Sequence, residues 1–173
     1  MNKSFQLLLF LAFVSIVSFR CTSDSLPGQD MEIDTGGENP DDRIVWTGAD
    51  ITFTKNTGTD PNAEANQDRL TDAVWITRGV TGGGIFNAKE ESGKANKSTS
   101  PIGTKWAIGR LDDIDRLDFK NFRAAVGSPK NVVGKNLVLH LEADNIYLSV
   151  EFTSWSQGSG ANGGGFEYVR STP

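Results

Sequence analysis

The stretch "NLVLHLEADNIYLSVEFTSW", residues 136–155, constrains the fold more than any other part of the chain. Apolar residues alternate with others on both sides of a turn within 142–145, which is the period of a β-hairpin with one buried face. A two-residue turn at 143–144 or at 144–145 gives the same parity, so either version places the same apolar residues on one face. These residues are Leu137, Leu139, Leu141, Ile146, Leu148, Val150 and Phe152.

Further short apolar runs follow the same pattern. They are "RIVWTG", "DITFTK", "DAVWITRG", "TKWAIG" and "FEYVR", and Gly, Asp or Lys bounds most of them. Runs of this length and spacing are typical of strands separated by tight connections. We therefore predict an all-β fold, an antiparallel β-sandwich (jelly-roll-like) with one short helix.

The helix is predicted in "DFKNFRAAVG", over 119–126. Phe119, Phe122 and Val126 stand at i, i+3 and i+7, the spacing of one helical face. Asp118 can cap the start and Gly127 the end.

The first twenty residues, 1–20, are predicted to be a signal peptide. Lys3 precedes the uncharged apolar stretch 5–19, which is short for a membrane span. Cys21, the only cysteine, follows at once, and the arrangement resembles a bacterial lipoprotein signal in which this cysteine carries the lipid. Plain secretion and an uncleaved membrane anchor are the alternatives, because Arg20 stands where such signals have a small residue.

The net negative charge of the chain comes from one segment. Residues 22–42 contain seven acidic residues and no Lys or Arg, whereas 43–173 contain 15 acidic and 15 basic residues. An acidic segment with few large apolar residues predicts a disordered tether over 21–42. The neutral module at 43–173 lacks the basic field that nucleic acid requires.

Several phrases of the module resemble one family. "NQDRLTDAVWITRG", "GIFNAKEES", "SPIGTKWAIG", "LVLHLEADNIYLSVEFTSW" and "GGGFEYVRSTP", in this order, resemble a β-rich module of secreted and surface proteins of many bacteria. The resemblance covers 43–173 and implies an extracellular location and a β-rich fold, but no activity. With the signal peptide it predicts an outer-membrane or cell-surface lipoprotein whose only membrane contact is its lipid anchor, with secretion as the alternative.

A glycan or protein ligand is the binding function that the polar side of the hairpin predicts. Aromatic rings stack on sugars while carboxylates and hydroxyls bind sugar hydroxyls. Trp155 is out of phase with Phe152 and is expected to face away from the apolar stripe. The Gly-rich loop after Trp155 is expected to project from one end of the sandwich, either as a plain connection or as a binding lip. The candidate ligand residues are His140, Tyr147, Glu151, Trp155, Gly163 and Gly164.

The alternative for the same residues is that they form an ordinary solvated sheet face, in a structural or assembly protein without a soluble ligand. Catalysis is not predicted, because nothing near the only histidine resembles a nucleophile elbow. A glycosidase pair of Glu151 and Glu167 on adjacent strands is the enzymatic alternative.

No cofactor is predicted, apart from calcium as a minor candidate. The segment "TDPNAEANQD" offers oxygen ligands, but it lacks the glycine and the terminal glutamate of an EF-hand loop. Asp and Asn in such a segment also form turns. The candidate ligands are Asp60, Asn62, Glu64 and Asp68.

Overall fold

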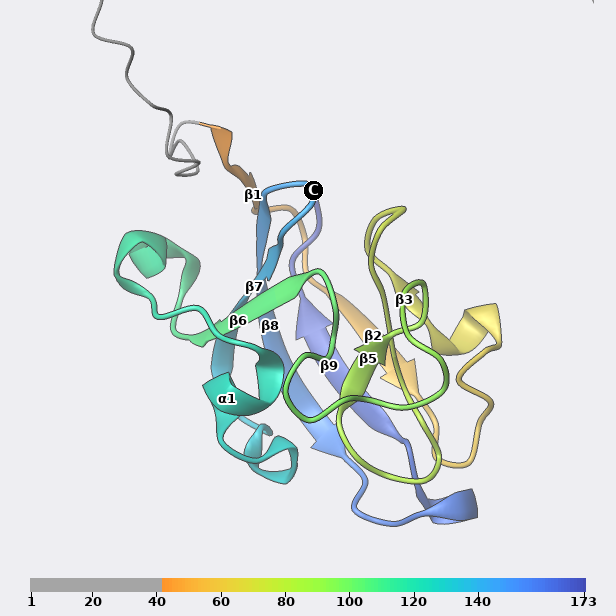
Figure 1. Ribbon diagram of the computed structural model, residues 1–173. Helices are drawn as coiled ribbons and strands as arrows, with labels where there is room; N and C mark the ends of the chain where they lie inside the picture. Colours follow the sequence, from red (N-terminus) through yellow and green to blue (C-terminus); the bar gives the residue numbers. More distant parts are fainter. Residues whose placement is uncertain (1–41) are drawn as a thin grey trace, which may run out of the picture. The chain divides into compact units, whose positions relative to one another are not determined.

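The computed structural model describes residues 42–173, which form two β-sheets with short helices in the connections (Figure 1). The signal peptide, Cys21 and almost all of the acidic segment lie outside the described residues. The larger sheet has the order β2-β9-β8-β7-β6, and β1 pairs with β8. Its strands are β1 (Ile44–Trp46), β2 (Ile51–Lys55), β6 (Thr104–Ile108), β7 (Asn136–Leu141), β8 (Ile146–Trp155) and β9 (Phe166–Arg170).

The predicted hairpin is β7–β8, and its register confirms the parity argument. Leu137, Leu139 and Leu141 lie opposite Val150, Leu148 and Ile146, respectively. This register has the parity of a two-residue turn at 143–144. The last paired residues are Leu141 and Ile146, one pair before the turn itself. All seven apolar residues of the stripe are buried.

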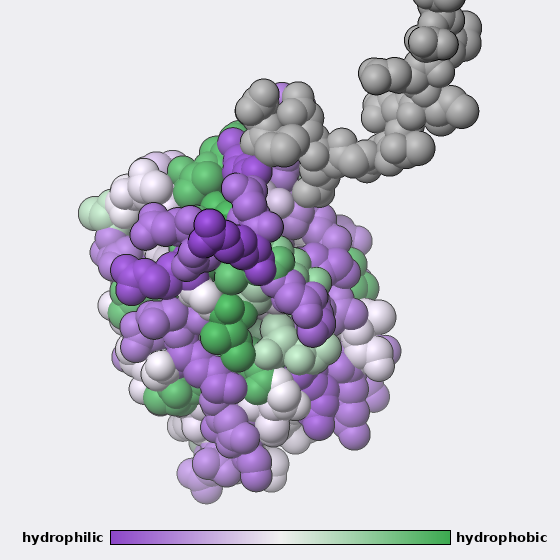
Figure 2. Space-filling view, turned by 90° about the vertical axis from the view of Figure 1, so that its left-hand side faces the viewer, coloured by the Kyte–Doolittle hydropathy of each residue, from purple (hydrophilic) through white to green (hydrophobic). Residues whose placement is uncertain are grey.

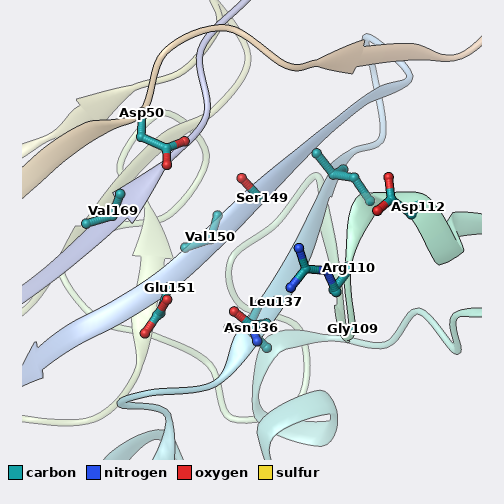
Figure 3. A pocket seen from close by; sticks show the side chains of 11 residues that line it. Asp50, Gly109, Arg110, Asp112, Asn136, Leu137, Ser149, Val150, Glu151 and Val169 are labelled. Carbon is teal, nitrogen blue, oxygen red and sulfur yellow. The ribbon is translucent and has the colours of Figure 1, made fainter.

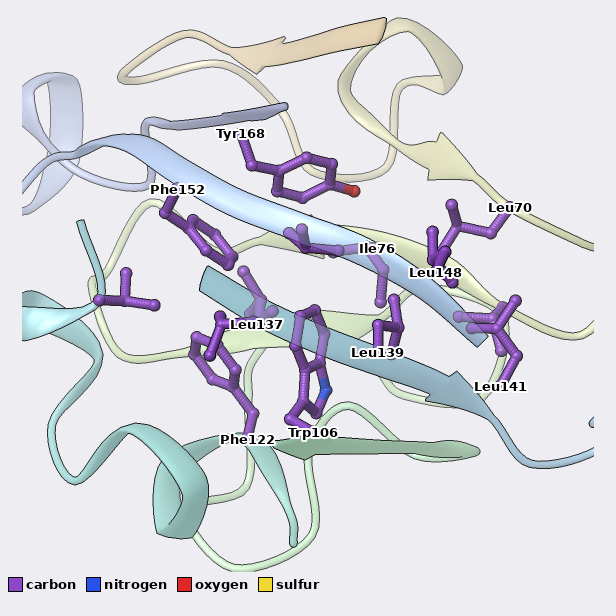
Figure 4. Packing of buried hydrophobic residues seen from close by; sticks show 14 of the residues in the cluster. Leu70, Ile76, Trp106, Phe122, Leu137, Leu139, Leu141, Leu148, Phe152 and Tyr168 are labelled. Atoms are coloured by element: carbon purple, nitrogen blue, oxygen red, sulfur yellow. The ribbon is translucent and has the colours of Figure 1, made fainter. Parts of the chain in front are cut away.

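The smaller sheet covers that apolar face. Its strands have the order β3-β4-β5, and Ile76 and Ile85 point from it into the same core as the stripe. Trp106 and Phe122 fill the adjoining part of the core, which Figure 4 shows between the layers. The fold is therefore all-β with a core between two sheets, as predicted. The three strands are β3 (Asp68–Arg69), β4 (Trp75–Arg78) and β5 (Ile85–Asn87).

The edge of β8 is shared by two strands. β9 pairs antiparallel with the second half of β8, from Val150 onward, and β1 pairs parallel with the first half, at 146–148. Trp46 at the end of β1 is buried in the core. The first strand of the module thus completes the sheet where β9 has ended.

The helix is shorter than predicted. α1 spans Phe122–Val126, begins after Asn121 and ends at Gly127, which has φ +78°. Asp118 is therefore not its cap. The backbone of Lys120 instead pairs with Trp106 through two hydrogen bonds of 2.7 and 2.9 Å, which holds the preceding residues extended. The other short helices of the described residues are 3-10 helices: η2 (Glu64–Asn66), η3 (Leu111–Arg116), η4 (Pro129–Asn131) and η5 (Gly160–Asn162).

A β-bulge at Thr153 reverses the expected orientation of Trp155. Phe152 lies opposite Tyr168, but Ser154 lies opposite Glu167, so Thr153 is an extra residue in β8. An extra residue shifts the alternation by one position. Trp155 therefore packs on the same side as Phe152, with ring centroids 5.7 Å apart. The prediction that Trp155 faces away from the apolar stripe was wrong for this reason.

The Gly-rich loop between β8 and β9 does not project freely. Gly163, Gly164 and Gly165 are buried, and the loop backbone bonds to two other connections of the fold. Gly58 N donates to Gly163 O at 2.8 Å, and Gly160 N donates to Val80 O at 2.8 Å. The expectation of a projecting loop is corrected, because its backbone is one of the packed surfaces of the molecule.

Candidate functional site

A groove of about 350 Å³ runs over the outer face of the larger sheet, opposite the core (Figure 3). Its floor crosses three strands, because Asn136 of β7, Glu151 of β8 and Val169 of β9 are neighbours in the ladder. Ser149 lies on the same face, two residues before Glu151. The alternation that buries the apolar stripe thus presents polar side chains to the groove.

Two connections form the walls of the groove. Asp50, which precedes β2, lies on one side. Arg110, between β6 and η3, and Asp112, within η3, lie on the other. Gly109 N donates to Asn136 O at 3.0 Å, which fixes the Arg110 wall to the sheet. In Figure 3 the guanidinium of Arg110 reaches from this wall over the floor, while Asp50 and Glu151 lie across from it.

The charges of the groove are not neutralised within the fold. The side chains of Asp50, Arg110 and Glu151 are exposed, and none of them forms a hydrogen bond or ion pair with another residue of 42–173. Most other arginines of the module are engaged; Arg43, for example, pairs with Asp115 at 2.7 Å. The groove therefore offers solvated charges of both signs to a ligand.

Glu167 is placed on the same outer face, beside the groove rather than in it. Its carboxylate accepts hydrogen bonds from the hydroxyls of Thr153 and Thr54, both at 2.7 Å. These two bonds, the one from Thr153 first, lower the pKa of Glu167. Glu151 and Glu167 thus face the same way, but Glu167 is already bound by two threonines.

The predicted ligand residues do not form one site. Only Glu151 lines the groove. His140 and Tyr147 are buried on the outer side of the sheet, where their rings stack with centroids 4.2 Å apart under Phe119. His140 Nε2 lies 3.1 Å from Asn145 Oδ1. These aromatic rings are covered and offer no open stacking surface to a sugar.

Trp155 and Gly165 contact Arg78, away from the groove. The Arg78 guanidinium lies 4.0 Å above the centre of the Trp155 ring. It donates to the carbonyl oxygens of Gly83, Ser156 and Gly165, each at 2.9 Å. Burial lowers the pKa of Arg78 to about 10. Four neutral partners, three carbonyl oxygens and the Trp155 ring, thus hold a buried cation. Gly163 and Gly164 lie instead against the backbone of residues 79–80.

Three of the four candidate calcium ligands, Asp60, Glu64 and Asp68, are each bound to a different partner within the fold. Asp60 Oδ1 accepts from Asn62 N at 2.9 Å, as in a turn, and Glu64 pairs with Arg69 at 3.0 Å. Asp68 is buried against Arg170. Among residues 42–173, His, Cys, Asp and Glu form no group of three or more that could hold a metal ion.

The charged groove residues that the sequence analysis missed are Asp50, Arg110 and Asp112. They stand in connections without hydrophobic periodicity, so no local pattern distinguishes them. The signal that could have found one of them is its position, since Arg110 directly follows the predicted strand "TKWAIG". The pairing of that strand with β7, which carries Arg110 to the groove, depends on contacts distant in sequence.

Other surfaces are less defined. Figure 2 shows the side of the molecule at the left of Figure 1, which is mostly hydrophilic, with hydrophobic side chains reaching the surface near its centre. A second cavity, of about 90 Å³, lies between the turn at Gly83 and Gly84 and the start of α1. Within the described part of the chain, no helix has the length and apolarity to cross a membrane.

Comparison of the chain with protein-family models, with curated proteins and with solved structures finds no match.

Proposed function

We propose that this protein is an exported, lipid-anchored and non-catalytic module of the bacterial cell surface that binds a glycan or protein ligand in the outer-face groove. The observation that carries the proposal is the set of polar side chains without partners in the described fold that gather over a floor of three paired strands. Binding sites commonly place a few convergent polar groups on a preformed concave surface. The signal peptide and Cys21 supply the location.

Hydrogen bonding, rather than ring stacking, is the mode of recognition that the groove supports. Ser149, Asn136 and the three carboxylates of the groove can bind hydroxyl or amide groups of a ligand, and Val169 supplies an apolar contact. Tyr147 and Trp155 are engaged elsewhere in the fold. A sugar chain or an extended peptide fits this chemistry equally well.

The predicted glycosidase pair of Glu151 and Glu167 is not supported, because only Glu151 lines the groove. Glu167 is held by Thr54 and Thr153 and does not line the groove. A retaining or inverting glycosidase needs two carboxyl groups that both face the scissile bond.

Binding can be tested by presenting the full-length protein, purified in detergent, to glycan and peptide arrays. The matched variants are Ser149→Leu, which fills the floor of the groove, and Ser154→Leu, an exposed position of the same strand outside it. We expect a ligand that is captured by the wild type and by Ser154→Leu but lost with Ser149→Leu. Equal capture by all three proteins would place the ligand elsewhere. No capture on either array would favour a structural or assembly component.

The anchor can be tested by metabolic labelling with a clickable fatty acid. We expect label on the wild type and none on Cys21→Ser, with the mature chain beginning at Cys21. Equal labelling of both proteins, or a mature N-terminus elsewhere, would reject lipidation and leave plain secretion.

A further inference from the structure

The second cavity, of about 90 Å³, is lined by two cations and, among residues 42–173, by no acidic side chain. Lys97 stands on one wall, in the connection between β5 and β6, and Arg123 stands on the other, in the first turn of α1. Both residues are exposed, and neither side chain forms an ion pair or hydrogen bond with another residue of 42–173. Two solvated positive charges thus share one hollow, in a module whose charges otherwise balance.

Two further cations adjoin this cavity in the sequence. Lys94 directly precedes the lining residue Ala95, and Lys130 directly follows the lining residue Pro129. Both lysines are exposed, and neither forms an ion pair within the described part of the chain. Charges of one sign that gather around a cleft raise the local concentration of ions of the opposite sign. The surroundings of the cavity therefore attract anions.

Hydrogen bonds hold the two walls of the cavity in place. Asn96 N donates to Ser100 Oγ at 2.6 Å, and Ser100 N donates to Asn96 O at 3.2 Å, which closes the loop that carries Lys97. Asn121 Nδ2 donates to Ser98 O, so this loop is fastened to the residue before α1. Binding therefore has to order side chains but not the backbone, which lowers its entropic cost.

Glu91 bonds to one residue of the lining, Ser100, but its carboxylate is directed into its own loop. One carboxylate oxygen accepts a hydrogen bond from the Ser100 hydroxyl. The other accepts the backbone amides of Asn87 and Ile102, at 2.8 and 2.9 Å. Because both oxygens are engaged in this way, Glu91 does not pair with the cations of the cavity.

The size of the cavity suits a single small group. Pockets for drug-sized ligands have about 300–1,000 Å³, several times the volume of this cavity. A sugar ring or a peptide is therefore too large to enter it. The wall opposite Lys97 includes Gly83 and Gly84, whose backbone amides donate to no residue of 42–173. They add neutral donors to the two cations.

We propose that this cavity binds a dianionic phosphate group between Arg123 and Lys97. Two unpaired cations match two negative charges, whereas a carboxylate carries only one. A guanidinium can bind phosphate oxygens through two parallel hydrogen bonds, and an ammonium group acts beside it as a point charge. The group can be free phosphate or a phosphate monoester on a sugar, because the recognition chemistry is the same. The site shares no lining residue with the outer-face groove and goes beyond the function proposed for that groove.

The test uses ¹⁵N-labelled full-length protein in an uncharged detergent, at constant ionic strength. Phosphate, glucose 6-phosphate, sulfate and acetate are titrated in, and the backbone amide shifts of 83, 84, 96, 97 and 123 are followed by NMR. We expect the three dianions to give saturable shifts on both walls and to bind at least fivefold tighter than acetate. Tighter binding of glucose 6-phosphate than of phosphate would assign an ester-borne group, and the reverse would assign the free ion.

The pH dependence separates phosphate from a dianion that does not titrate. The second pKa of a phosphate monoester is about 6, so lowering the pH from 7.5 to 5.0 should weaken glucose 6-phosphate by about tenfold. Sulfate keeps both charges over this range and serves as the control, so its affinity should stay unchanged.

Variants assign the two cations. Arg123→Gln and Lys97→Gln should each weaken phosphate binding at least fivefold, and the double variant should show no saturable shifts. Arg116→Gln removes an exposed positive charge outside the cavity and should bind phosphate like the wild type. Arg123 and Lys97 have no side-chain partners in the described fold, so all these variants should melt with the wild type.

Three results would overturn the inference. One is equal binding of phosphate and acetate. Another is phosphate binding that is unchanged in the double variant, or that Arg116→Gln weakens as much as Arg123→Gln does. The third is the absence of saturable shifts on the two walls with every probe. None of these results bears on the outer-face groove, which the arrays and Ser149→Leu test separately.

Discussion

Phe152 is the centre of the aromatic part of the core. Its side chain is fully buried, and its ring lies 5.2–6.3 Å from five other aromatic rings. We expect Phe152→Ala to lower the free energy of unfolding by ~3–5 kcal/mol, through lost burial and the cavity left behind. Urea denaturation measures the loss, and Ser154→Ala in the same strand, at an exposed position, serves as the control. A loss similar to that of the control would contradict the packing described.

Tyr168 connects the core to a buried ion pair. Its hydroxyl donates to Asp68 Oδ2 at 2.5 Å. Burial, and then the charge of Asp68 and the hydrogen bond to it, raise the pKa of Tyr168 well above its ordinary value. Because the pKa of Tyr168 is higher in the folded state, its hydroxyl loses the proton at a lower pH in the unfolded chain than in the folded protein. The stability from this group is therefore complete below pH ~10 and falls as the pH rises further.

Tyr168→Phe removes that titration. We expect the variant to lose ~1.5–3 kcal/mol at neutral pH, because a hydrogen bond to a charged group is lost. Between pH 9 and 11 its stability should fall less steeply than that of the wild type. Chemical denaturation across this range tests the slope, and parallel pH profiles of the two proteins would show that Tyr168 does not contribute.

At the scale of the elements, the β-bulge at Thr153 could not be predicted from hydrophobic alternation, which does not show where an extra residue interrupts a strand. Deleting one residue from a regular strand turns every later side chain to the opposite face. Deleting Thr153 instead removes the extra residue and keeps Trp155 opposite Phe166. We expect the deletion protein to fold with a buried-type Trp155 fluorescence spectrum. Deletion of Ser149 should abolish folding, because it lies in a regular part of β8; equal damage from both deletions would argue against the bulge.

We predict that the Gly-rich loop does not tolerate a side chain at Gly163. A Cβ atom there would lie 2.1 Å from Val80 O, and backbone cannot yield as a side chain can. Gly84 is the matched control, since a Cβ atom there would meet Ala95 Cβ at an ordinary 3.6 Å. We expect Gly163→Ala to lower the melting temperature markedly and Gly84→Ala to change it little. Similar melting of the two variants would mean that the loop adapts.

These elements also show where sequence reasoning succeeded and where it failed. The β7–β8 hairpin was predicted with its faces because alternation and turn length are both local. The start of α1 was misplaced because the Lys120 backbone pairs with Trp106, a partner that local periodicity does not indicate. β3 has only two residues, so no period exists to detect it.

At the scale of the whole molecule, a buried ion pair joins the two sheets. Arg170 of β9 donates to both carboxylate oxygens of Asp68 in β3, at 2.7 and 2.9 Å, and both side chains are buried. The Asp68 carboxylate raises the pKa of Arg170 against the lowering effect of burial, the largest single influence. The sheets are thus connected by a geometry that satisfies both charges.

Breaking this pair should destabilise the molecule more than replacing it. We expect Asp68→Asn to cost ~3–5 kcal/mol, because Arg170 keeps its buried charge without a counter-charge. The double variant Asp68→Leu with Arg170→Met should cost less than Asp68→Asn alone. Guanidinium denaturation followed by both far-UV and near-UV circular dichroism tests this, and a double variant less stable than the single one would refute it.

The parallel pairing of β1 with β8 determines how the fold bears mechanical load. Tension arriving along the chain ahead of Ile44, in the direction of the strand axis, pulls β1 lengthwise past β8. In that direction the hydrogen bonds of the ladder are sheared together instead of being opened one after another. Trp46, inserted in the core at the end of β1, would have to leave its packing in the same event. β1 should therefore resist extension of the fold by a force applied from the N-terminal side.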